Sequence, residues 1–252
     1  MSLVVQDLSK KYGTRTVVDH LSFEMNRPGV YALLGTNGAG KTTSIRMMLG
    51  MLSRDSGTVT RNGKPLDINT CNVGYLAEER GLYPKYTIMD QLMYFAALRG
   101  VSASEAKKRI HYWAERFDII EYLYPQEYAD IQAKKARMHE EASPKKKGLF
   151  GSSNQRKKRI APKTADQLSK GNQQKIQFMT AIIHDPELVV LDEPFSGLDP
   201  VNTEILKNII INLIKNGKYI IMSAHQMSTI EEFCSDILIL NKGKTVIKGN
   251  LK

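Results

Sequence analysis

The chain has 252 residues and only two cysteines, Cys71 and Cys234. They are not in CxxC spacing, and no third cysteine could join them in a metal site. Two cysteines are also too few to indicate a fold built on several disulfides. We therefore expect two reduced, packed thiols and a fold that is held together by its core.

Long hydrophobic runs and a targeting segment are also missing. No run approaches the roughly 18 consecutive apolar residues that a membrane-spanning helix needs. Residues 1–7 contain no basic stretch followed by an apolar region, so they do not resemble a secretory signal. Since 42% of the residues are hydrophobic and no repeat recurs at a fixed period, we expect residues 1–252 to form a single α/β domain exposed to the cytosol.

Outside one segment, the chain has almost no excess of either charge. Residues 131–165 contain 11 Lys and Arg against 2 Asp and Glu, which accounts for +9 of the net charge of +10. The remainder has 25 basic and 24 acidic residues. The basic charge is therefore a local feature, and it does not indicate a fold built to bind nucleic acid.

A glycine-rich motif that fits G-x-x-x-x-G-K-[ST] runs from Gly35 to Thr42. It follows an apolar strand expected over Val30–Leu34 and opens a helix expected over Lys41–Leu49. Small residues let consecutive backbone N–H groups turn inward around a phosphate at a helix N-terminus. The expected nucleotide-binding residues here are Gly35, Thr36, Asn37, Gly38, Ala39, Gly40, Lys41, Thr42 and Thr43.

A second motif, Leu188–Pro194, lies far downstream. Its four apolar residues predict a buried parallel strand that delivers Asp192 to the same Mg²⁺ ion as the Thr42 hydroxyl. Lys41 would reach the β- and γ-phosphates, and Glu193 is the expected general base. The two motifs in this order indicate an ATP-driven protein.

The remaining patterns divide the chain into regions of different structure. An Asn62-Gly63 turn predicts antiparallel hairpins in the first third, and helices are expected between residues 87 and 117. Further helices should begin at Ser169 and at Asp199-Pro200. An alternating β/α ending is expected, with a helix between strands at 218–223 and 236–240.

Three further motifs carry a family resemblance. Residues 168–175 (Leu-Ser-Lys-Gly-Asn-Gln-Gln-Lys) resemble the signature motif of ATP-binding cassette (ABC) proteins, residues 196–199 resemble the D-loop, and His225 matches the switch histidine. The resemblance covers essentially the whole chain. It implies a RecA-like P-loop core with an antiparallel β subdomain, over residues 1–84 and 185–252, and a helical subdomain over 85–184 that contains a basic insertion at 131–165.

The resemblance also implies a head-to-tail dimer in which each ATP lies between one chain's phosphate loop and the other chain's signature helix. Ser169, Gly171 and Asp199 would then contact ATP across the interface, and His225 would contact the γ-phosphate. Tyr12 matches the aromatic residue that stacks on adenine in the family. Three local alternatives stay open, namely packing of Tyr12 on its own sheet, capping by His225 and N-capping by Asp199.

The sequence departs from the family pattern at two motifs. Glu78 stands where the Q-loop usually has glutamine, and its carboxylate could still reach Mg²⁺. In the signature, Lys170 and Asn172 replace the usual Gly and Gln. With residues 78–84, these departures resemble the bacterial sodium- and drug-efflux branch of ABC exporters.

The basic insertion has three possible functions. It could be a flexible solvated loop, since such a composition buries little apolar surface. It could dock on anionic lipid or on a membrane partner, because the helical region faces that partner in relatives. Non-specific nucleic-acid contact is the third possibility, and no specific nucleic acid is expected.

Together these features predict the ATPase subunit of a bacterial ABC exporter for an ion, a drug or an antimicrobial peptide. It would be peripheral, on the cytoplasmic face of the membrane, and bound to integral membrane transporter subunits. The alternative is a soluble ABC ATPase of a cytosolic assembly machine, such as iron–sulfur cluster biogenesis. The chain ends soon after the strand expected at 244–248, where many relatives continue with further helices.

Overall fold

The computed structural model describes residues 1–66, 72–79, 81–141 and 161–251. Its strands form one sheet of ten, in the order β5-β4-β1-β2-β10-β9-β3-β8-β7-β6. Together with the helices, this sheet makes an α/β fold, as the sequence predicted. The strands are β1 (Leu3–Tyr12), β2 (Arg15–Met25), β3 (Gly29–Leu34), β4 (Ser56–Arg61), β5 (Lys64–Pro65), β6 (Val73–Leu76), β7 (Leu188–Leu191), β8 (Tyr219–Ala224), β9 (Asp236–Asn241) and β10 (Lys244–Asn250).

The sheet has an antiparallel part and a parallel part. Strands β1, β2, β4 and β5 pair antiparallel, with the tight turn at Asn62-Gly63 joining β4 to β5. Strands β3, β8, β7 and β6 pair parallel to their neighbours, and β9 pairs parallel to β3 but antiparallel to β10. Every residue of β3, β7 and β8 is buried, as continuous apolar runs in a parallel sheet predict.

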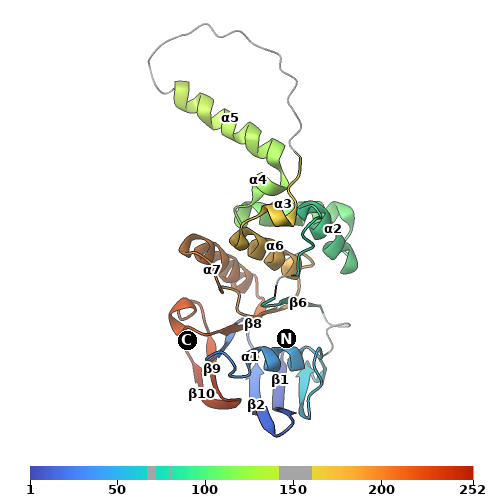
Figure 1. Ribbon diagram of the computed structural model, residues 1–252, viewed down its shortest axis with the longest axis vertical. Coiled ribbons are helices and arrows are strands. Elements are labelled where there is room, and N and C mark those ends of the chain that lie inside the picture. Colours follow the sequence, from blue (N-terminus) through green and yellow to red (C-terminus); the bar gives the residue numbers. More distant parts are fainter. Residues whose placement is uncertain (67–71, 80, 142–160, 252) are drawn as a thin grey trace.

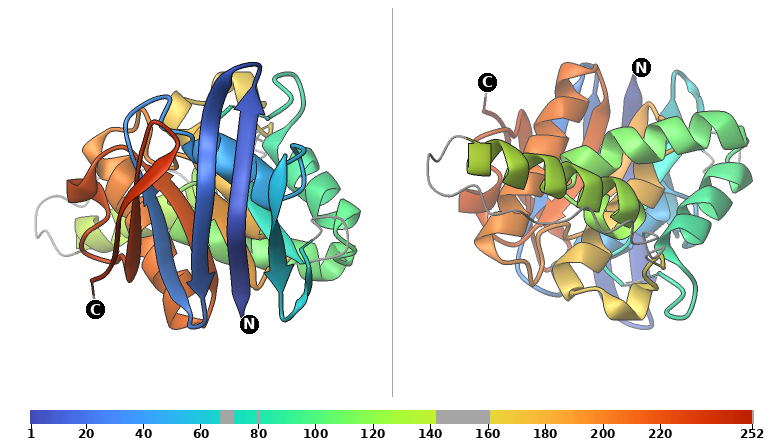
Figure 2. Two further views of the ribbon diagram at one scale, coloured as in Figure 1. Left: turned by 90° about the horizontal axis from the view of Figure 1, so that it is seen from below. Right: turned by 90° about the horizontal axis from the view of Figure 1, so that it is seen from above.

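Helix α1 (Lys41–Met48) lies between these two parts of the sheet (Figures 1 and 2). Its buried residues Ile45, Met47 and Met48 share one apolar core with Leu3 of β1 and Leu33 of β3. The helix that follows the phosphate loop is thus packed from both sides, and the loop is fixed at one end of it.

The other helices form layers on the opposite face of the parallel strands (Figure 1). Thr87, Ser102, Ser169 and Asp199 each cap a helix N-terminus through their side chains, as the sequence predicts for Ser169 and Asp199. These helices are α2 (Ile88–Leu98), α3 (Ala103–Arg116), α4 (Ile120–Leu123), α5 (Pro125–Glu141), α6 (Lys170–Ile182) and α7 (Pro200–Lys215). Figure 1 shows α5 extending away from the rest of the molecule.

The prediction of a helix between β8 and β9 is wrong. Between β8 and β9 the structure has only a 3₁₀ turn, η2 (Met227–Thr229), followed by further turns. Ile230 and Phe233 are both buried, so this short connection follows the packing of its apolar residues on the core and does not complete a regular helix.

The two cysteines and the insertion can be placed only in part. Cys234 is a buried thiol whose Sγ lies 3.1 Å from the carbonyl oxygen of Asp236, in agreement with a packed side chain. Cys71 lies outside the described residues, as do residues 142–160 of the basic insertion. None of the helices in the described ranges is long and apolar enough to cross a membrane.

Candidate functional site

The phosphate loop closes against the beginning of β2. Gly40 is the N-cap of α1 with a φ of 102°, a conformation that residues with a side chain rarely adopt. A Cβ atom at this position would lie 2.6 Å from the carbonyl oxygen of Val17. Gly40 is therefore required both by its backbone conformation and by the close approach of a second chain segment.

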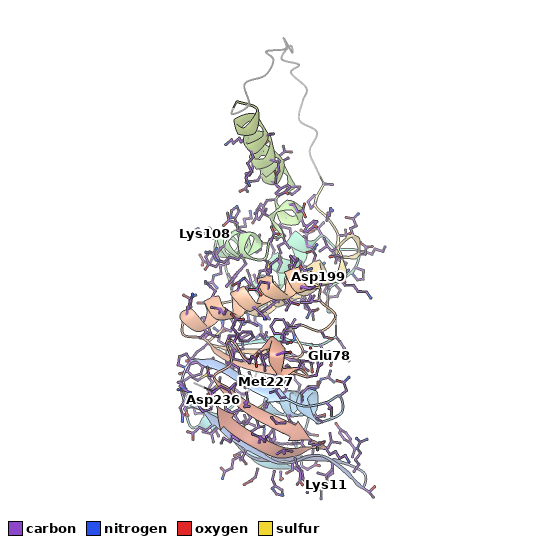
Figure 3. The ribbon with its side chains drawn as sticks, turned by 90° about the vertical axis from the view of Figure 1, so that its left-hand side faces the viewer. Lys11, Glu78, Lys108, Asp199, Met227 and Asp236 are labelled. Atoms are coloured by element: carbon purple, nitrogen blue, oxygen red, sulfur yellow. The ribbon has the colours of Figure 1, made fainter. Side chains whose placement is uncertain are left out.

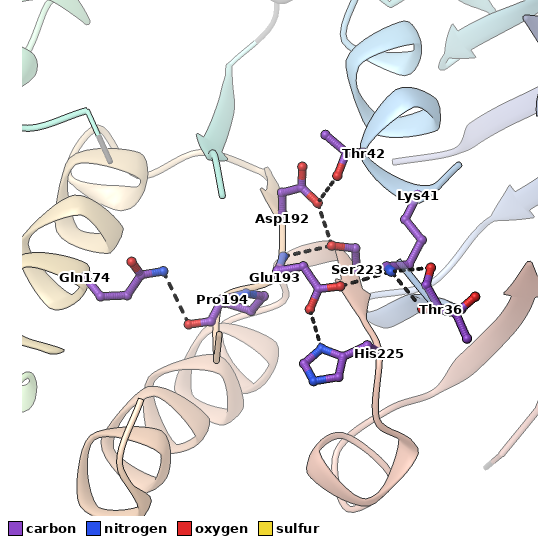
Figure 4. Close-up of polar contacts among 10 residues, drawn as sticks. Thr36, Lys41, Thr42, Gln174, Asp192, Glu193, Pro194, Ser223 and His225 are labelled. Carbon is purple, nitrogen blue, oxygen red and sulfur yellow. Dashed lines mark hydrogen bonds and ion pairs between the residues drawn. The ribbon is translucent and has the colours of Figure 1, made fainter. Parts of the chain in front are cut away.

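Lys41 is folded back over its own loop. Its Nζ donates hydrogen bonds to the carbonyl oxygens of Gly35, at 2.7 Å, and Thr36, at 3.3 Å. The same atom lies 3.1 Å from Oε1 of Glu193, in an ion pair whose side chains are 6% and 9% exposed. The loop lysine and the expected general base are thus in direct contact (Figure 4).

Asp192 follows β7 and is completely buried. Its Oδ1 accepts hydrogen bonds from Ser223 Oγ at 2.6 Å and from Thr42 Oγ1 at 3.2 Å. Desolvation by burial raises the pKa of Asp192, and the hydrogen bonds from Ser223 and Thr42 oppose this shift. Its Oδ2 is buried without a hydrogen-bond partner among the described residues, which leaves one carboxylate oxygen available for a cation.

Glu193 has a left-handed backbone, with a φ of 48°. Such a conformation is strained for a residue with a side chain and is often found at functional sites. Its backbone N–H donates to Ser223 Oγ at 2.8 Å, and its Oε2 lies 3.0 Å from Nδ1 of His225. Both carboxylate oxygens of Glu193 therefore face a basic group, Lys41 on one side and His225 on the other.

A pocket of about 230 Å³ lies over the phosphate loop. The structure brings three expected parts together there, the loop, Glu193 and the Q-loop residue Glu78. Within the described ranges, no group of three or more His, Cys, Asp and Glu side chains could hold a metal ion. Thr42 and Asp192 nevertheless fit Mg²⁺, which usually takes one or two protein ligands together with phosphate oxygens and water.

Tyr12 is placed at the end of β1 and is 52% exposed. The ammonium of Lys10 lies 5.6 Å from the centre of its ring. A second pocket, of about 300 Å³, adjoins the phosphate loop at Gly38 and is also lined by Arg15, Thr16, Val17 and Lys242. Adenine stacking on Tyr12 stays a prediction.

The expected signature residues do not line the phosphate-loop pocket of their own chain. Ser169 caps α6 and Asp199 caps α7. Figure 3 shows Asp199 on the same side of the molecule as Glu78. Asp199 accepts hydrogen bonds from the backbone N–H of Asn202 at 2.9 Å and from its Nδ2 at 2.5 Å. A Cβ atom on Gly171 would lie 2.6 Å from that Nδ2, so α6 and α7 meet closely at these two residues.

Sequence reasoning missed Ser223, Val17 and Gln174. Ser223 contacts both motif carboxylate residues, and the polar end of the apolar run 219–222 is the signal that could have identified it. Val17 reaches the loop from the beginning of β2. Gln174 Nε2 donates to the carbonyl oxygen of Pro194 at 3.4 Å and links α6 to the strand end at Glu193 (Figure 4).

Comparison with known proteins places these features in one family. Residues 18–196 match the family model described as "ABC transporter". The chain is 42% identical over 251 residues to an uncharacterized ABC transporter ATP-binding protein, YhaQ, from Bacillus subtilis (strain 168). That alignment covers 99% of this chain and 72% of the relative.

Two further comparisons extend the likeness. A protein named Nod factor export ATP-binding protein I, from Ralstonia nicotianae, is 30% identical over 251 residues, which cover 98% of this chain and 66% of that protein. A solved structure described as the ATP binding subunit of an ABC transporter is 26% identical and superposes with a TM-score of 0.77. It covers 100% of this chain and 90% of its own.

Proposed function

The chain belongs to the ATP-binding proteins of ABC transporters, which are ATPases, and from this premise we propose that it energises export through separate membrane subunits of a bacterial transporter. The observation that carries the proposal is the contact of Lys41, Glu193 and His225 around the phosphate-loop pocket. Export is supported by the similarity to the relative named Nod factor export ATP-binding protein I.

The geometry suits hydrolysis of the terminal phosphate of ATP. Glu193 would accept a proton from the attacking water, since its carboxylate faces the pocket and is held between two basic groups. Lys41 would leave Glu193 and neutralise charge on the transferred phosphoryl group. His225, whose side chain is 48% exposed, would reach the same phosphate from the end of β8.

Mg²⁺ would be held by Thr42 and Asp192, with Glu78 as a further candidate ligand at the rim of the pocket. When bound there, the ion would neutralise negative charge on the phosphates of ATP. The unpartnered Oδ2 of buried Asp192 is the main support for this assignment. Ser223 fixes the other oxygen and so holds the carboxylate in position.

The ATP site would be completed by a second chain, in a head-to-tail dimer of identical or related subunits. Two observations support this. Ser169, Gly171 and Asp199 do not line the pocket over the phosphate loop of their own chain. Ser169 begins α6 with an exposed side chain, so the helix N-terminus can point its dipole at a phosphate bound to another subunit.

The helical region offers a surface for the membrane subunit. Tyr83, Tyr86 and Tyr94 are each at least 50% exposed and, with Asp90 and Gln91, line a pocket of about 430 Å³. Tyrosine-rich concave surfaces of this kind are typical of protein interfaces. We expect Tyr86→Ala with Tyr94→Ala to release the membrane subunit while ATP binding persists, because neither residue lines the phosphate-loop pocket.

The basic insertion would contact anionic lipid near that partner. Its described lysines, Lys134, Lys135 and Lys163, are exposed. Each basic residue close to an anionic leaflet contributes about 1 kcal/mol. Deleting residues 131–161 should abolish co-sedimentation with anionic vesicles and leave nucleotide binding intact, whereas loss of nucleotide binding in the deletion would contradict the proposal.

The deciding experiment is purification of tagged Glu193→Gln from detergent-solubilised native membranes with ATP and Mg²⁺, followed by a high-salt wash. This variant should hold ATP without hydrolysing it. An integral membrane protein recovered in stoichiometric amount supports a peripheral subunit on the cytoplasmic face of the membrane. Recovery of soluble proteins alone would contradict it and favour a cytosolic assembly ATPase. Glu204→Gln, an exposed change on α7, is the matched control.

A further inference from the structure

Tyr122 connects the base of the inserted segment to the signature motif. It lies on α4, shortly before α5, the helix on which the basic insertion begins. Its hydroxyl accepts a hydrogen bond from Nδ2 of Asn172 at 3.1 Å. Asn172 is one of the two signature residues that depart from the family pattern, so this contact joins two features particular to this chain.

The far end of the insertion reaches the same tyrosine. The ammonium of Lys163 lies 4.7 Å from the centre of the Tyr122 ring, within the range of a cation–π contact. The carbonyl oxygen of Lys163 accepts a hydrogen bond from the backbone N–H of Ile88, at the beginning of α2. The chain that leads into the insertion and the chain that leaves it therefore meet at one side chain, which also contacts the signature.

Charged groups around Tyr122 link it to further residues of the signature helix and to the D-loop. A hydrogen bond to the carboxylate of Glu121 raises the pKa of Tyr122 to about 12, so the hydroxyl keeps its proton and donates it to Glu121 while accepting from Asn172. Lys175, one turn beyond Asn172, is buried; burial lowers its pKa, and the charges of Asp118, Asp199 and Glu121 oppose that shift. The D-loop residue Asp199 thus lies within electrostatic range of the same cluster.

We propose that Tyr122 is a positioning residue that couples the inserted segment to ATP hydrolysis by holding Asn172 at the start of the signature helix. Because the signature would contact ATP only across the dimer, this inference rests on the proposed function. Displacing Asn172 would move the helix N-terminus that faces the γ-phosphate. The phosphate loop, the Lys41–Glu193 pair and Tyr12 would be unaffected, since Tyr122 contacts none of them.

The test is steady-state ATP hydrolysis by the full chain carrying Tyr122→Phe, which removes the hydroxyl and keeps the ring. We expect kcat to fall about three- to tenfold, as for the loss of one hydrogen bond, with KM for ATP unchanged. Tyr122→Leu, which also removes the contact with Lys163, should lower kcat further. The matched control is Tyr124→Phe, which removes a neighbouring hydroxyl that donates only to the carbonyl oxygen of Lys107.

A double-mutant cycle separates coupling from a general loss of stability. Adding Asn172→Ala to Tyr122→Phe should lower kcat little more than either change alone, because both remove the same contact. Additive effects, or a kcat equal to that of Tyr124→Phe, would overturn the coupling while leaving the proposed function standing. A wild-type chain that does not hydrolyse ATP would contradict the proposed function itself. Thermal unfolding of each variant shows whether all are folded.

Discussion

The ammonium of Lys41 lies 3.1 Å from the carboxylate of Glu193, and both side chains are almost completely buried. The group expected to bind phosphate and the group expected to activate water therefore neutralise one another before a nucleotide enters. ATP has to replace Glu193 as the partner of Lys41. Removing the negative charge of Glu193 should then favour nucleotide binding and abolish turnover.

Glu193→Gln should lower the rate of ATP hydrolysis at least about 100-fold, which is the usual contribution of a general base. Its affinity for ATP should rise, because Lys41 no longer has to leave an ion pair. Phosphate release and the binding of a fluorescent ATP analogue measure the two effects. Glu204→Gln should change neither, and near-normal hydrolysis by Glu193→Gln would mean that another group is the base.

His184 makes the stability of the fold depend on pH. Burial, with the nearby charges of Arg99 and Arg109, lowers its pKa from 6.5 to about 4. Between these values the unfolded chain binds a proton that the folded protein does not, so the free energy of unfolding falls as the pH falls from about 6.5 to 4. Above pH 6.5 His184 is neutral in both the folded and the unfolded chain, and the free energy of unfolding keeps its full value.

His184→Gln should flatten that dependence in urea unfolding measured from pH 7 to pH 4.5, while keeping a possible donor to the carbonyl oxygen of Val73. His20→Gln is the control, because the side chain of His20 is 71% exposed. An equal loss of stability with acid in wild type and His184→Gln would exclude His184 as the cause.

The close approach of Gly171 to Asn202 predicts a specific rescue. Gly171→Ala should displace the Asn202 amide, which lies 2.6 Å from the new Cβ, and cost about 1–2 kcal/mol of stability. Asn202→Ala should lower the free energy of unfolding by about 1 kcal/mol, because it removes the hydrogen bond from the Asn202 amide to Asp199. The double variant should be more stable than the sum of the two losses predicts, and thermal unfolding measures this difference. Strict additivity would show that the two side chains do not compete for space.

Gly74 on β6 allows α6 to pack directly on the sheet. A Cβ atom there would lie 2.0 Å from the carbonyl oxygen of Ala181, a backbone atom that cannot rotate away. Gly74→Ala should therefore destabilise the fold by about 3 kcal/mol or more. Gly81→Ala, with no atom within 4 Å of the new Cβ, should have little effect. Chemical denaturation compares the two, and equal midpoints would contradict the packing argument.

The sequence predicts the parts of this structure that depend on neighbouring residues. The phosphate loop, the strand before Asp192 and the caps at Ser169 and Asp199 all follow from local patterns, because their conformations are set within a few residues. The sequence predicts a helix where the structure has the short turn at 227–229, since the apolar residues that follow it, Ile230 and Phe233, suit either conformation until the core is known.

Contacts between distant residues could not be predicted in this way. Ser223 reaches Asp192 because β7 and β8 are paired in parallel, and only the strand order reveals this. The contact between Tyr122 and Asn172 spans 50 residues of sequence. The left-handed backbone of Glu193 likewise depends on the turn that follows β7. The residue types at this position do not predict a positive φ.

Helix α1 is held between the antiparallel and parallel parts of the sheet, and its apolar side chains belong to the core of both. The phosphate loop therefore cannot open unless two halves of one sheet separate, which would expose Leu3, Leu33 and Met47 to water. ATP would therefore bind to a part of the molecule, the phosphate loop and helix α1, that stays fixed relative to the sheet. Any movement that ATP produces has to take place in the helices above it, which include α2 with the exposed Tyr94 and α5, where the inserted segment begins.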